Sequence, residues 1–499
     1  MWLTQLLERN RQCLGARVAL ADARQTLTWE ELAQRVERLA GRLSALGVRH
    51  GDRVAVLSRD RVEVLETYFA LGRLGALFVP LSPDLVPGEI AEAAEHAKIG
   101  GIIGEAELLA HTGGPAPAPP DAPGGWRLAF EDPRFHGTGA VPAPCPESDV
   151  RADDPLAILY TSATSGHPKG VVVDHRSVKD IALGWLAVAA PPPGAVLAAC
   201  CPLFHGTLVL TLAYLAAGTT VVLPGSEPRE ITAAMRRHRV THLWLVPETL
   251  RAVLDEPDGL PAPGGPLTEI LYGAAPLPVE LYARAARRLG CGFRQVYGLT
   301  EAGGPIVTLG PAQHPHPDGA LPEALPAGQV IPGMSVRIAD RTGRELPTGS
   351  TGEILVRGDG VMRGYWRDPA ATAAGWVAGW LRTGDLGHLD EHGRLHLVDR
   401  ITDVIIRSGR NVYPAEVERV LRRHPEVADA AVVPVPDLAE GQIPLALVVL
   451  RPGHRASPEE ILRRLTSEMA EYKIPKEVQV IDDLPRNSTG KVQKRLLTA

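Results

Sequence analysis

The sequence of 499 residues predicts an α/β protein with a large N-terminal domain and a small α/β C-terminal domain. The large domain is expected to contain two α/β layers and a small β-rich subdomain. Helical and strand-like apolar patterns alternate as far as Gly310, short strands separated by Pro and Gly follow, and the last part alternates again. Because 499 residues exceed what one compact core accommodates, we place the domains at residues 1–399 and 400–499.

The first layer is expected where apolar residues recur at helical spacing and are followed by strand patterns. Thr28 can cap the first of these helices. The expected elements, in chain order, are helix 32–46, strand 52–57, helix 62–74 and strand 76–81. Residues 111–146 are rich in Pro, Ala and Gly, so we expect an exposed connection there, with a short strand at 126–130.

The later elements are read in the same way. Ser177 can cap a helix that extends to residue 189. The expected strands of the second layer are 195–200, 219–223, 241–246 and 269–272, and those of the β-rich subdomain are 335–338, 352–357 and 395–398. In the C-terminal domain we expect helices at 416–423 and 458–469 and strands at 428–434, 445–450 and 477–481.

Composition limits the possible functions. A net charge of −6 provides no overall field for nucleic acid or an anionic membrane, so no partner of either kind is expected. The five cysteines are odd in number and form no C-x-x-C pair, which argues against a disulfide framework or a structural zinc. The N-terminus does not resemble a signal peptide, and no apolar stretch approaches the ~20 residues that span a bilayer. A reducing cytoplasm is therefore the expected location.

A polar loop between two strand patterns, residues 160–170, dominates the sequence. It contains hydroxyl side chains, glycines and one lysine, in a composition that suits a phosphate group. The members that we expect to contact phosphate are Thr161, Ser162, Thr164, Ser165, Gly166 and Lys169. The G-x-x-x-x-G-K spacing of a Walker loop is absent. Judged from these residues alone, an ordinary surface loop remains the alternative.

The order Tyr-Thr-Ser-x-x-x-Gly-x-Pro-Lys-Gly in this loop resembles the phosphate loop of the adenylate-forming superfamily. That superfamily includes acyl-CoA synthetases, the adenylation domains of peptide synthetases, and luciferases. Ala163 replaces a glycine of the usual pattern. Four further motifs follow in the superfamily's order, so that the resemblance covers about the whole chain. It implies a mobile C-terminal domain, with ATP, Mg²⁺ and coenzyme A as the cofactors and a small carboxylic acid as the substrate.

The second motif is Tyr297-Gly298-x-Thr300-Glu301, at the end of a predicted strand, where α/β sheets bind ligands. The resemblance implies that Tyr297 stacks on adenine, that Thr300 bonds the α-phosphate, and that Glu301 is both a catalytic residue and the Mg²⁺ ligand. A carboxylate is an apt ligand for a hard cation. Without the motif, a lone glutamate is more often a solvated loop acid.

The remaining motifs lie near the domain boundary and beyond it. Asp385, in Thr-Gly-Asp, is expected to hold the ribose hydroxyls, and Arg400 to reach the same ribose or a phosphate. Gly409 is expected beside the path of the pantetheine thiol. Lys491, in Pro-Arg-x-x-x-Gly-Lys, matches the catalytic lysine of the superfamily. Thr402 stands where the superfamily usually has Asp or Lys as the pivot of domain rotation, so the pivot residue stays open.

The acyl pocket is expected, by resemblance, from the residues that follow 204–206 and from those around 243–249, 271–277 and 298–304. Gly273, Ala274 and Ala275 are also placed with the nucleotide-binding residues, and His205 and Thr161 with the catalytic ones. His205 stands where amino-acid-activating domains usually have an aspartate, so a plain or aryl acid is favoured. Glu248 leaves room for a polar substrate.

The reaction expected from this resemblance has two steps. A carboxylic acid and ATP give an acyl adenylate and pyrophosphate, and the acyl group then passes to a thiol, that of coenzyme A being favoured. A carrier-protein thiol or a nitrogen nucleophile is the alternative acceptor, and an inactive scaffold of the same fold is the rival from another class. The identity of the acid and the oligomeric state stay open.

Overall fold

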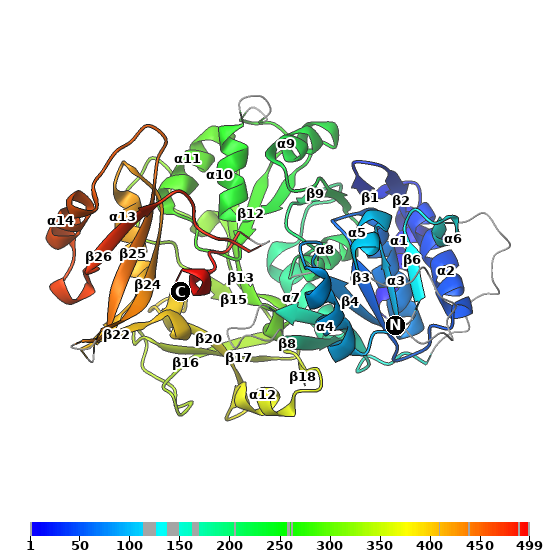
Figure 1. Ribbon diagram of the computed structural model, residues 1–499. Coiled ribbons are helices and arrows are strands. Elements are labelled where there is room, and N and C mark those ends of the chain that lie inside the picture. Colours follow the sequence, from blue (N-terminus) through cyan, green and yellow to red (C-terminus); the bar gives the residue numbers. More distant parts are fainter. Residues whose placement is uncertain are drawn as a thin grey trace.

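The structure is a computed structural model of the whole chain. It describes residues 2–112, 126–136, 149–161, 169–203, 206–256, 260, 263–408, 410–437, 440–487 and 490–497. The large domain and the C-terminal domain lie beside each other, the latter in orange and red at the left of Figure 1. In the described ranges, no helix is long and apolar enough to cross a bilayer.

One sheet of the large domain has seven strands. They are β3 (Arg53–Leu57), β4 (Leu77–Leu81), β5 (Gly101–Gly104), β6 (Trp126–Ala129), β7 (Pro155–Thr161), β8 (Lys169–Asp174) and β18 (Gly364–Tyr365). Their order is β18-β8-β7-β4-β3-β5-β6. Neighbours from β7 to β6 are parallel, whereas β8 is antiparallel to both β7 and β18. Its helices are α2 (Trp29–Ala45), α3 (Val62–Leu74), α4 (Pro87–Ala97), α5 (Ala106–His111) and α6 (Pro133–His136).

The other sheet of the large domain has nine strands. They are β1 (Val18–Asp22), β2 (Thr26–Thr28), β9 (Val196–Ala199), β10 (Thr220–Leu223), β11 (His242–Leu245), β12 (Glu269–Gly273), β13 (Gly292–Leu299), β14 (Gly304–Leu309) and β15 (Gln329–Val330). Their order is β15-β14-β13-β12-β11-β9-β10-β1-β2. The helices of this layer are α1 (Trp2–Leu14), α7 (His175–Ala189), α8 (Thr207–Ala216), α9 (Pro228–Arg237), α10 (Pro247–Asp255) and α11 (Val279–Leu289).

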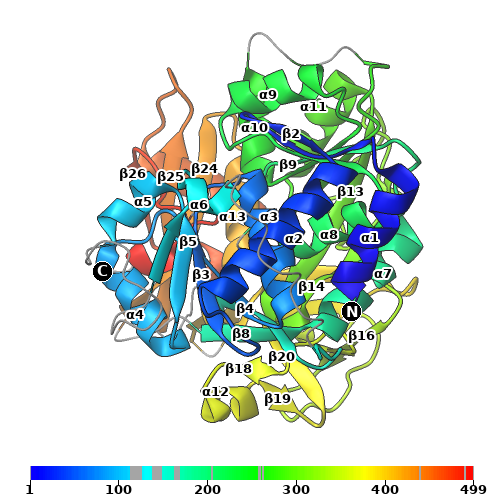
Figure 2. The same cartoon turned by 90° about the vertical axis from the view of Figure 1, so that its right-hand side faces the viewer.

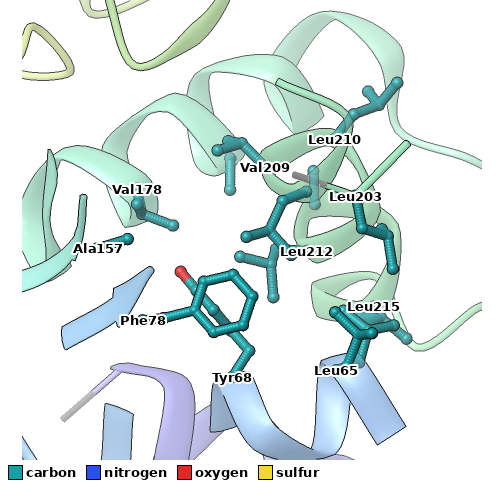
Figure 3. Close-up of a cluster of buried hydrophobic side chains, with 14 of the residues drawn as sticks. Leu65, Tyr68, Phe78, Ala157, Val178, Leu203, Val209, Leu210, Leu212 and Leu215 are labelled. Atoms are coloured by element: carbon teal, nitrogen blue, oxygen red, sulfur yellow. The ribbon is translucent and has the colours of Figure 1, made fainter. Parts of the chain in front are cut away.

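The two layers share one apolar core. Figure 3 shows Tyr68 of α3 and Phe78 of β4 pointing toward side chains of α7 and α8. The rings of Tyr68 and Phe78 meet edge to face, with centroids 5.1 Å apart, a contact that contributes about 0.5–1.5 kcal/mol beyond burial. Helix α8 is buried from Thr207 to Leu215, so its first turn is held rigidly between the sheets.

The β-rich subdomain lies at the bottom of Figure 2, in yellow. Its elements are β16 (Met334–Ala339), β17 (Gly352–Gly358), β19 (Trp376–Val377), β20 (Trp380–Leu389), β21 (Leu395–Arg400) and α12 (Pro369–Ala374). The sheet order is β16-β17-β20-β19, with β21 paired to β20. Short 3-10 turns occur in each part of the chain: Thr300–Ala302, Pro311–Gln313, Ile401–Asp403, Glu471–Lys473 and Lys494–Leu496.

The C-terminal domain forms a sheet of its own. Its elements are β22 (Ile405–Arg407), β23 (Arg410–Val412), β24 (Val427–Asp437), β25 (Gly441–Leu450), β26 (Glu477–Ile481), α13 (Pro414–Arg423) and α14 (Pro458–Glu468). The order is β23-β22-β25-β24, and β26 runs parallel to β25. A separate core extends from Ile405 to Val478. The predicted fold class, with two α/β layers, a β-rich subdomain and a small α/β domain, is confirmed.

Of the two predicted helix caps, one is correct and one is displaced by three residues. Thr28 caps α2 as predicted, in a reciprocal pair of hydrogen bonds with Glu31. The prediction that Ser177 caps the helix after β8 is wrong, because α7 begins at His175 and its cap is Asp174. Ser177 is instead the third residue of the helix, and its hydroxyl accepts the Asp174 N–H at 3.1 Å. Much of the expected connection 111–146 lies outside the described residues.

Candidate active site

A cavity of about 1080 Å³ lies between the large domain, its β-rich subdomain and the C-terminal domain. Eight of the predicted site residues line it: Thr161, Lys169, Ala274, Gly298, Thr300, Glu301, Arg400 and Lys491. They come from positions up to 330 residues apart in the chain, and the fold brings them around one space. His205 and Gly409 lie outside the described residues, as do Ser162, Thr164, Ser165 and Gly166.

Both ends of the predicted phosphate loop reach this cavity. Strand β7 ends at Thr161 and β8 begins at Lys169, and these two residues are paired across the antiparallel ladder. The two strands that flank the predicted phosphate loop therefore meet the cavity at Thr161 and Lys169. The Lys169 ammonium lies 5.1 Å from the centre of the Tyr365 ring, a distance typical of a cation–π contact.

Glu301 faces the same part of the cavity as Lys169. Its carboxylate accepts a hydrogen bond of 3.2 Å from the Tyr365 hydroxyl. Burial, with the adjacent Glu301 carboxylate, raises the pKa of Tyr365, so the phenol keeps its proton and stays a donor. The sequence analysis did not identify Tyr365. A single carboxylate beside a lysine and a hydroxyl-rich loop suits Mg²⁺, which proteins commonly bind through one or two carboxylates and the phosphates of a substrate.

Asp385 is held between two partners at the β20–β21 ladder. Its Oδ2 accepts a 2.7 Å hydrogen bond from the Tyr297 hydroxyl, and its Oδ1 lies 3.1 Å from Nε of Arg400, the residue opposite it in the ladder. Gly384 has φ = 72°, a left-handed conformation that favours glycine. A carboxylate has about four acceptor positions, so two remain for the hydroxyls of a ribose.

Tyr297 and the end of β12 are more enclosed than the rest of the site. Tyr297 is only 9% exposed, and it does not line the cavity; Asp385, Gly273 and Ala275 do not line it either. A side chain at Gly273 would place its Cβ 2.3 Å from the Val296 carbonyl oxygen, so glycine is required there. Ala274 does line the cavity, with φ = 63°.

Lys491 is carried into the cavity by a hairpin of the C-terminal domain. The Lys491 N–H donates to Oδ1 of Asn487, and the Asn487 N–H donates to the Lys491 carbonyl, each at 2.9 Å. Lys491 is exposed and lines the cavity, close to Arg400 and Asp385. Desolvation, together with the nearby Arg400, lowers the pKa of Lys491. Thus Lys491 shares one space with Glu301 and Thr161.

Of two residues near the domain boundary, Thr402 faces the cavity and Arg407 makes its contacts within the C-terminal domain. Thr402 lines the cavity, and its hydroxyl donates to the Asp403 carboxylate at 3.0 Å. Arg407 pairs with Glu440 and donates to the carbonyls of Tyr472 and Ile474. In this arrangement its guanidinium is used to hold the C-terminal domain together.

One part of the cavity is apolar. Trp244, at the end of β11, donates its indole N–H to the Thr207 hydroxyl at 3.0 Å, at the first turn of α8. The far edge of its ring lies 3.0 Å from where a Cβ on Gly273 would be. The other residues of this part are Cys201, Pro202, Gly206, Leu210, Val246, Val296, Leu299, Gly304 and Pro305. The predicted pocket segments, after 204–206 and around 243–249, 271–277 and 298–304, each contribute at least one residue to the cavity lining.

Glu248 lies outside the cavity, against the C-terminal domain. It is absent from the cavity lining, and its carboxylate lies 2.9 Å from NH1 of Arg486 in the C-terminal domain. The expectation that it meets a polar substrate is therefore not supported by its position.

Comparison with known families agrees with this geometry. The family described as "AMP-binding enzyme" matches residues 7–366, and the family described as "AMP-binding enzyme C-terminal domain" matches residues 416–491. The chain belongs to the AMP-binding enzyme family. The chain is 36% identical over 481 residues to the fatty acid–[acyl-carrier-protein] ligase ScoC of Streptomyces coeruleorubidus, covering 95% of this chain and 91% of the relative. It is 35% identical over 485 residues to feruloyl-CoA synthase of Amycolatopsis sp, covering 94% and 92%.

Solved structures of related enzymes have the same fold. The o-succinylbenzoate CoA synthetase MenE of Bacillus subtilis, in complex with its acyl-adenylate intermediate, matches with a TM-score of 0.86 at 29% identity, covering 99% of this chain and 98% of the other. The amide bond synthetase McbA of Marinactinospora thermotolerans matches with a TM-score of 0.85 at 30% identity, covering 99% of each chain.

These relationships confirm the predicted superfamily and activity class. Among the relatives are CoA ligases and an acyl-carrier-protein ligase, and MenE has also been solved with ATP and a magnesium ion. These relatives act on small carboxylic acids with coenzyme A or a carrier protein, as the sequence predicted for this chain.

Proposed function

We propose that the enzyme activates a largely apolar carboxylic acid, with no charged group besides the reacting carboxylate, as an acyl adenylate. It then transfers the acyl group to the thiol of coenzyme A. One observation carries this proposal: a single cavity joins a polar part, with Thr161, Lys169, Glu301 and Lys491, to an apolar part that includes Trp244. The polar part suits the phosphates of ATP, and the apolar part suits the body of an organic acid.

The substrate class follows from the lining of the apolar part. Among the described residues that line it, none carries a charge, and Thr207 already accepts the indole N–H. An amino acid would leave its ammonium without a carboxylate partner, and a dicarboxylic acid would leave one carboxylate without a cation. A flat aryl or arylalkenyl acid, or an aliphatic acid of moderate length, has no such cost.

The roles of the polar residues follow from charge and position. We assign Lys169 and the hydroxyls of Thr161, Ser162, Thr164 and Ser165 to the phosphates, with Gly166 allowing their close approach. Glu301 would hold Mg²⁺, which when bound neutralises phosphate charge and orients the leaving group.

Thr300 donates to the α-phosphate in this proposal, and Asp385 accepts the ribose hydroxyls. Ala274 and Gly298, which line the cavity, flank the adenine, and Tyr297, Gly273 and Ala275 are kept as nucleotide-binding candidates on sequence grounds. Lys491 and Arg400 supply positive charge where the attacking carboxylate meets the α-phosphate.

The second step requires the C-terminal domain, residues 400–499 in our division, to turn relative to residues 1–399. We propose that Gly409 then lies beside the pantetheine chain, where the absence of a side chain leaves room for it. We keep His205 as a catalytic candidate on sequence grounds. The likeness to the ligase ScoC and to McbA supports the two alternative acceptors, a carrier-protein thiol and a nitrogen nucleophile.

A panel of acids tests the proposal. Pyrophosphate release is measured with ATP, Mg²⁺ and cinnamic-type acids, benzoic acids, medium-chain fatty acids, malonate and amino acids, and each active acid is then offered coenzyme A, a carrier protein and amines. We expect pyrophosphate release with the acids that have no second charged group, which are the cinnamic-type, benzoic and fatty acids. We expect thioester formation with coenzyme A. Preference for malonate or an amino acid would contradict the substrate class, and transfer only to another acceptor would contradict the second step.

The oxidation state of the cysteines concerns the cellular compartment of the enzyme. Cys13, Cys200, Cys201 and Cys291 are free thiols. We propose a reducing cytoplasm, where such thiols persist.

Trp244 gives a test of the acyl pocket. In Trp244→Ala the indole is lost, so the ratio of kcat/KM for a bulky acid over a small acid should rise about tenfold or more, since one methylene alone is worth roughly 10- to 200-fold in such pockets. Steady-state pyrophosphate release with a matched pair of acids measures the ratio. Trp244→Phe, which keeps an aromatic ring, is the milder control if the alanine variant folds poorly. An unchanged ratio in both variants would remove Trp244 from the acyl pocket.

Lys491 predicts a pH dependence. Its ammonium must be charged in the first step, and its pKa is lowered, so this step should decline with rising pH before an ordinary lysine would lose its proton. Thioester formation from a supplied acyl adenylate should lack this decline. In Lys491→Arg, whose side chain stays charged, the alkaline limb of the first step should vanish, whatever the remaining rate. An identical limb in the arginine variant would assign it to another group.

A further inference from the structure

Arg486 of the C-terminal domain connects three parts of the molecule. Its NH1 lies 2.9 Å from Oε2 of Glu248, in the first turn of α10 on the large domain. Its NH2 pairs with Asp429 on β24, and its NH1 also donates to the Gly490 carbonyl at 2.7 Å. The side chain of Arg486 is 25% exposed and that of Glu248 is 49% exposed. The pair is therefore partly exposed to solvent, while the other contacts of Arg486 hold its guanidinium in place.

Arg486 begins the hairpin that carries the catalytic lysine candidate. The hairpin is closed by a bridge between Arg486 and Val492, and the Gly490 N–H donates to the Asn487 carbonyl at 2.9 Å. Lys491 follows Gly490 directly. The guanidinium therefore contacts the backbone one residue before the lysine, and any shift of Arg486 moves Lys491.

Glu248 contacts this hairpin from the large domain. A Cβ on Gly490 would lie 3.3 Å from Oε2 of Glu248 and 3.6 Å from Cγ2 of Val246, a residue of the apolar part. Glu248 itself does not line the cavity. Its position suits a role in holding the hairpin against the large domain, and it does not suit contact with the substrate.

Other interdomain contacts lie away from Lys491. Arg419 and Arg423 of α13 contact Glu323 at 2.8 and 3.2 Å. They join the same two domains without touching the hairpin, and they therefore provide a matched comparison.

We propose that Glu248 is a positioning residue for adenylation, which acts through Arg486 to hold the Lys491 hairpin in the cavity. This inference rests on the proposed function, because it concerns the first of the two steps. The ion pair joins the two domains, so it must separate when the C-terminal domain turns for the second step. Its contribution should accordingly appear in the first step and be absent from the second.

Glu248→Gln tests this, since it removes the charge and keeps the shape. We expect the rate of ATP–pyrophosphate exchange to fall about three- to fivefold, as fits a partly exposed pair, while thioester formation from a supplied acyl adenylate is unchanged or faster. Added salt should slow exchange in the wild type and have much less effect in the variant. Glu248→Asp should recover part of the loss. In Glu323→Gln, which removes the remote contact, the change should stay below about twofold.

A second readout needs no turnover. Hydrogen exchange at the hairpin amides of Asn487, Gly490 and Lys491 should quicken in Glu248→Gln and stay as in the wild type in Glu323→Gln. Equal loss in both half-reactions, equal losses in the two variants, or unchanged hairpin exchange would overturn the proposal. If the wild type releases pyrophosphate with no acid, the proposed function fails, and hydrogen exchange still decides the role of Glu248.

Discussion

Lys491→Ala should reduce acyl-adenylate formation on the order of 10³-fold, since removing one preorganised charge-stabilising group costs about 10²–10³ in kcat. The lysine shares its cavity with Glu301 and Thr161, and it is near Asp385 and Arg400. Among the described cavity residues, the other lysine is Lys169. It is held on β8 beside Tyr365, so it does not replace the charge of Lys491. The measurement is ATP–pyrophosphate exchange under saturating acid.

The same variant has a built-in control. Thioester formation from a supplied acyl adenylate should be nearly unchanged, because the lysine acts only before the C-terminal domain turns. The hairpin hydrogen bonds to Asn487 involve the Lys491 backbone, so alanine leaves them in place. Comparable loss in both half-reactions would instead indicate misfolding, or a role for the lysine in both steps.

Glu301→Gln should raise the Mg²⁺ concentration needed for half-maximal pyrophosphate release by at least about tenfold and should lower the maximal rate. A neutral amide is a poor ligand for a hard divalent ion, and even groups that only orient metal ligands change affinity about 10- to 100-fold. The measurement is a Mg²⁺ titration of pyrophosphate release at fixed ATP.

Tyr365→Phe is the matched control for Glu301. It removes the 3.2 Å hydrogen bond to the carboxylate but keeps the carboxylate and the ring beside Lys169. We expect a shift in the same direction that is smaller than that of Glu301→Gln. If the metal dependence of Glu301→Gln matches that of the wild type, Glu301 does not bind the metal.

The sequence was sufficient for features that depend on local pattern. The helices and strands that apolar spacing predicted in the two layers lie within a few residues of the observed ones, although α1, β1 and α4 were given no bounds. The motif residues Thr161, Glu301 and Lys491 lie on one cavity. Each of these follows a strand or stands in a hairpin, where backbone pattern determines position. The cap of α7 was misplaced because Asp174 and Ser177 both have suitable side chains, and the sequence alone does not say which one begins the helix.

Features that depend on contact between distant segments were not predictable. Tyr365 meets Glu301 across 64 residues, Trp244 meets Thr207 across 37, and Arg486 meets Glu248 in the other domain. A tyrosine, a tryptophan or an arginine in isolation is compatible with many environments, so no local signal identifies its partner. For the same reason Glu248 was first considered as a substrate contact, and the structure places it against the Lys491 hairpin.

The separate cores of the two domains have a thermodynamic consequence. The apolar cluster of the large domain extends from Leu3 to Leu395, and that of the C-terminal domain from Ile405 to Val478; among the described residues, no buried cluster contains members of both. Each part can therefore unfold as its own cooperative unit. A nucleotide that touches both stabilises them only while they are docked. Binding in the cavity thus links two folding equilibria that the polypeptide itself keeps apart.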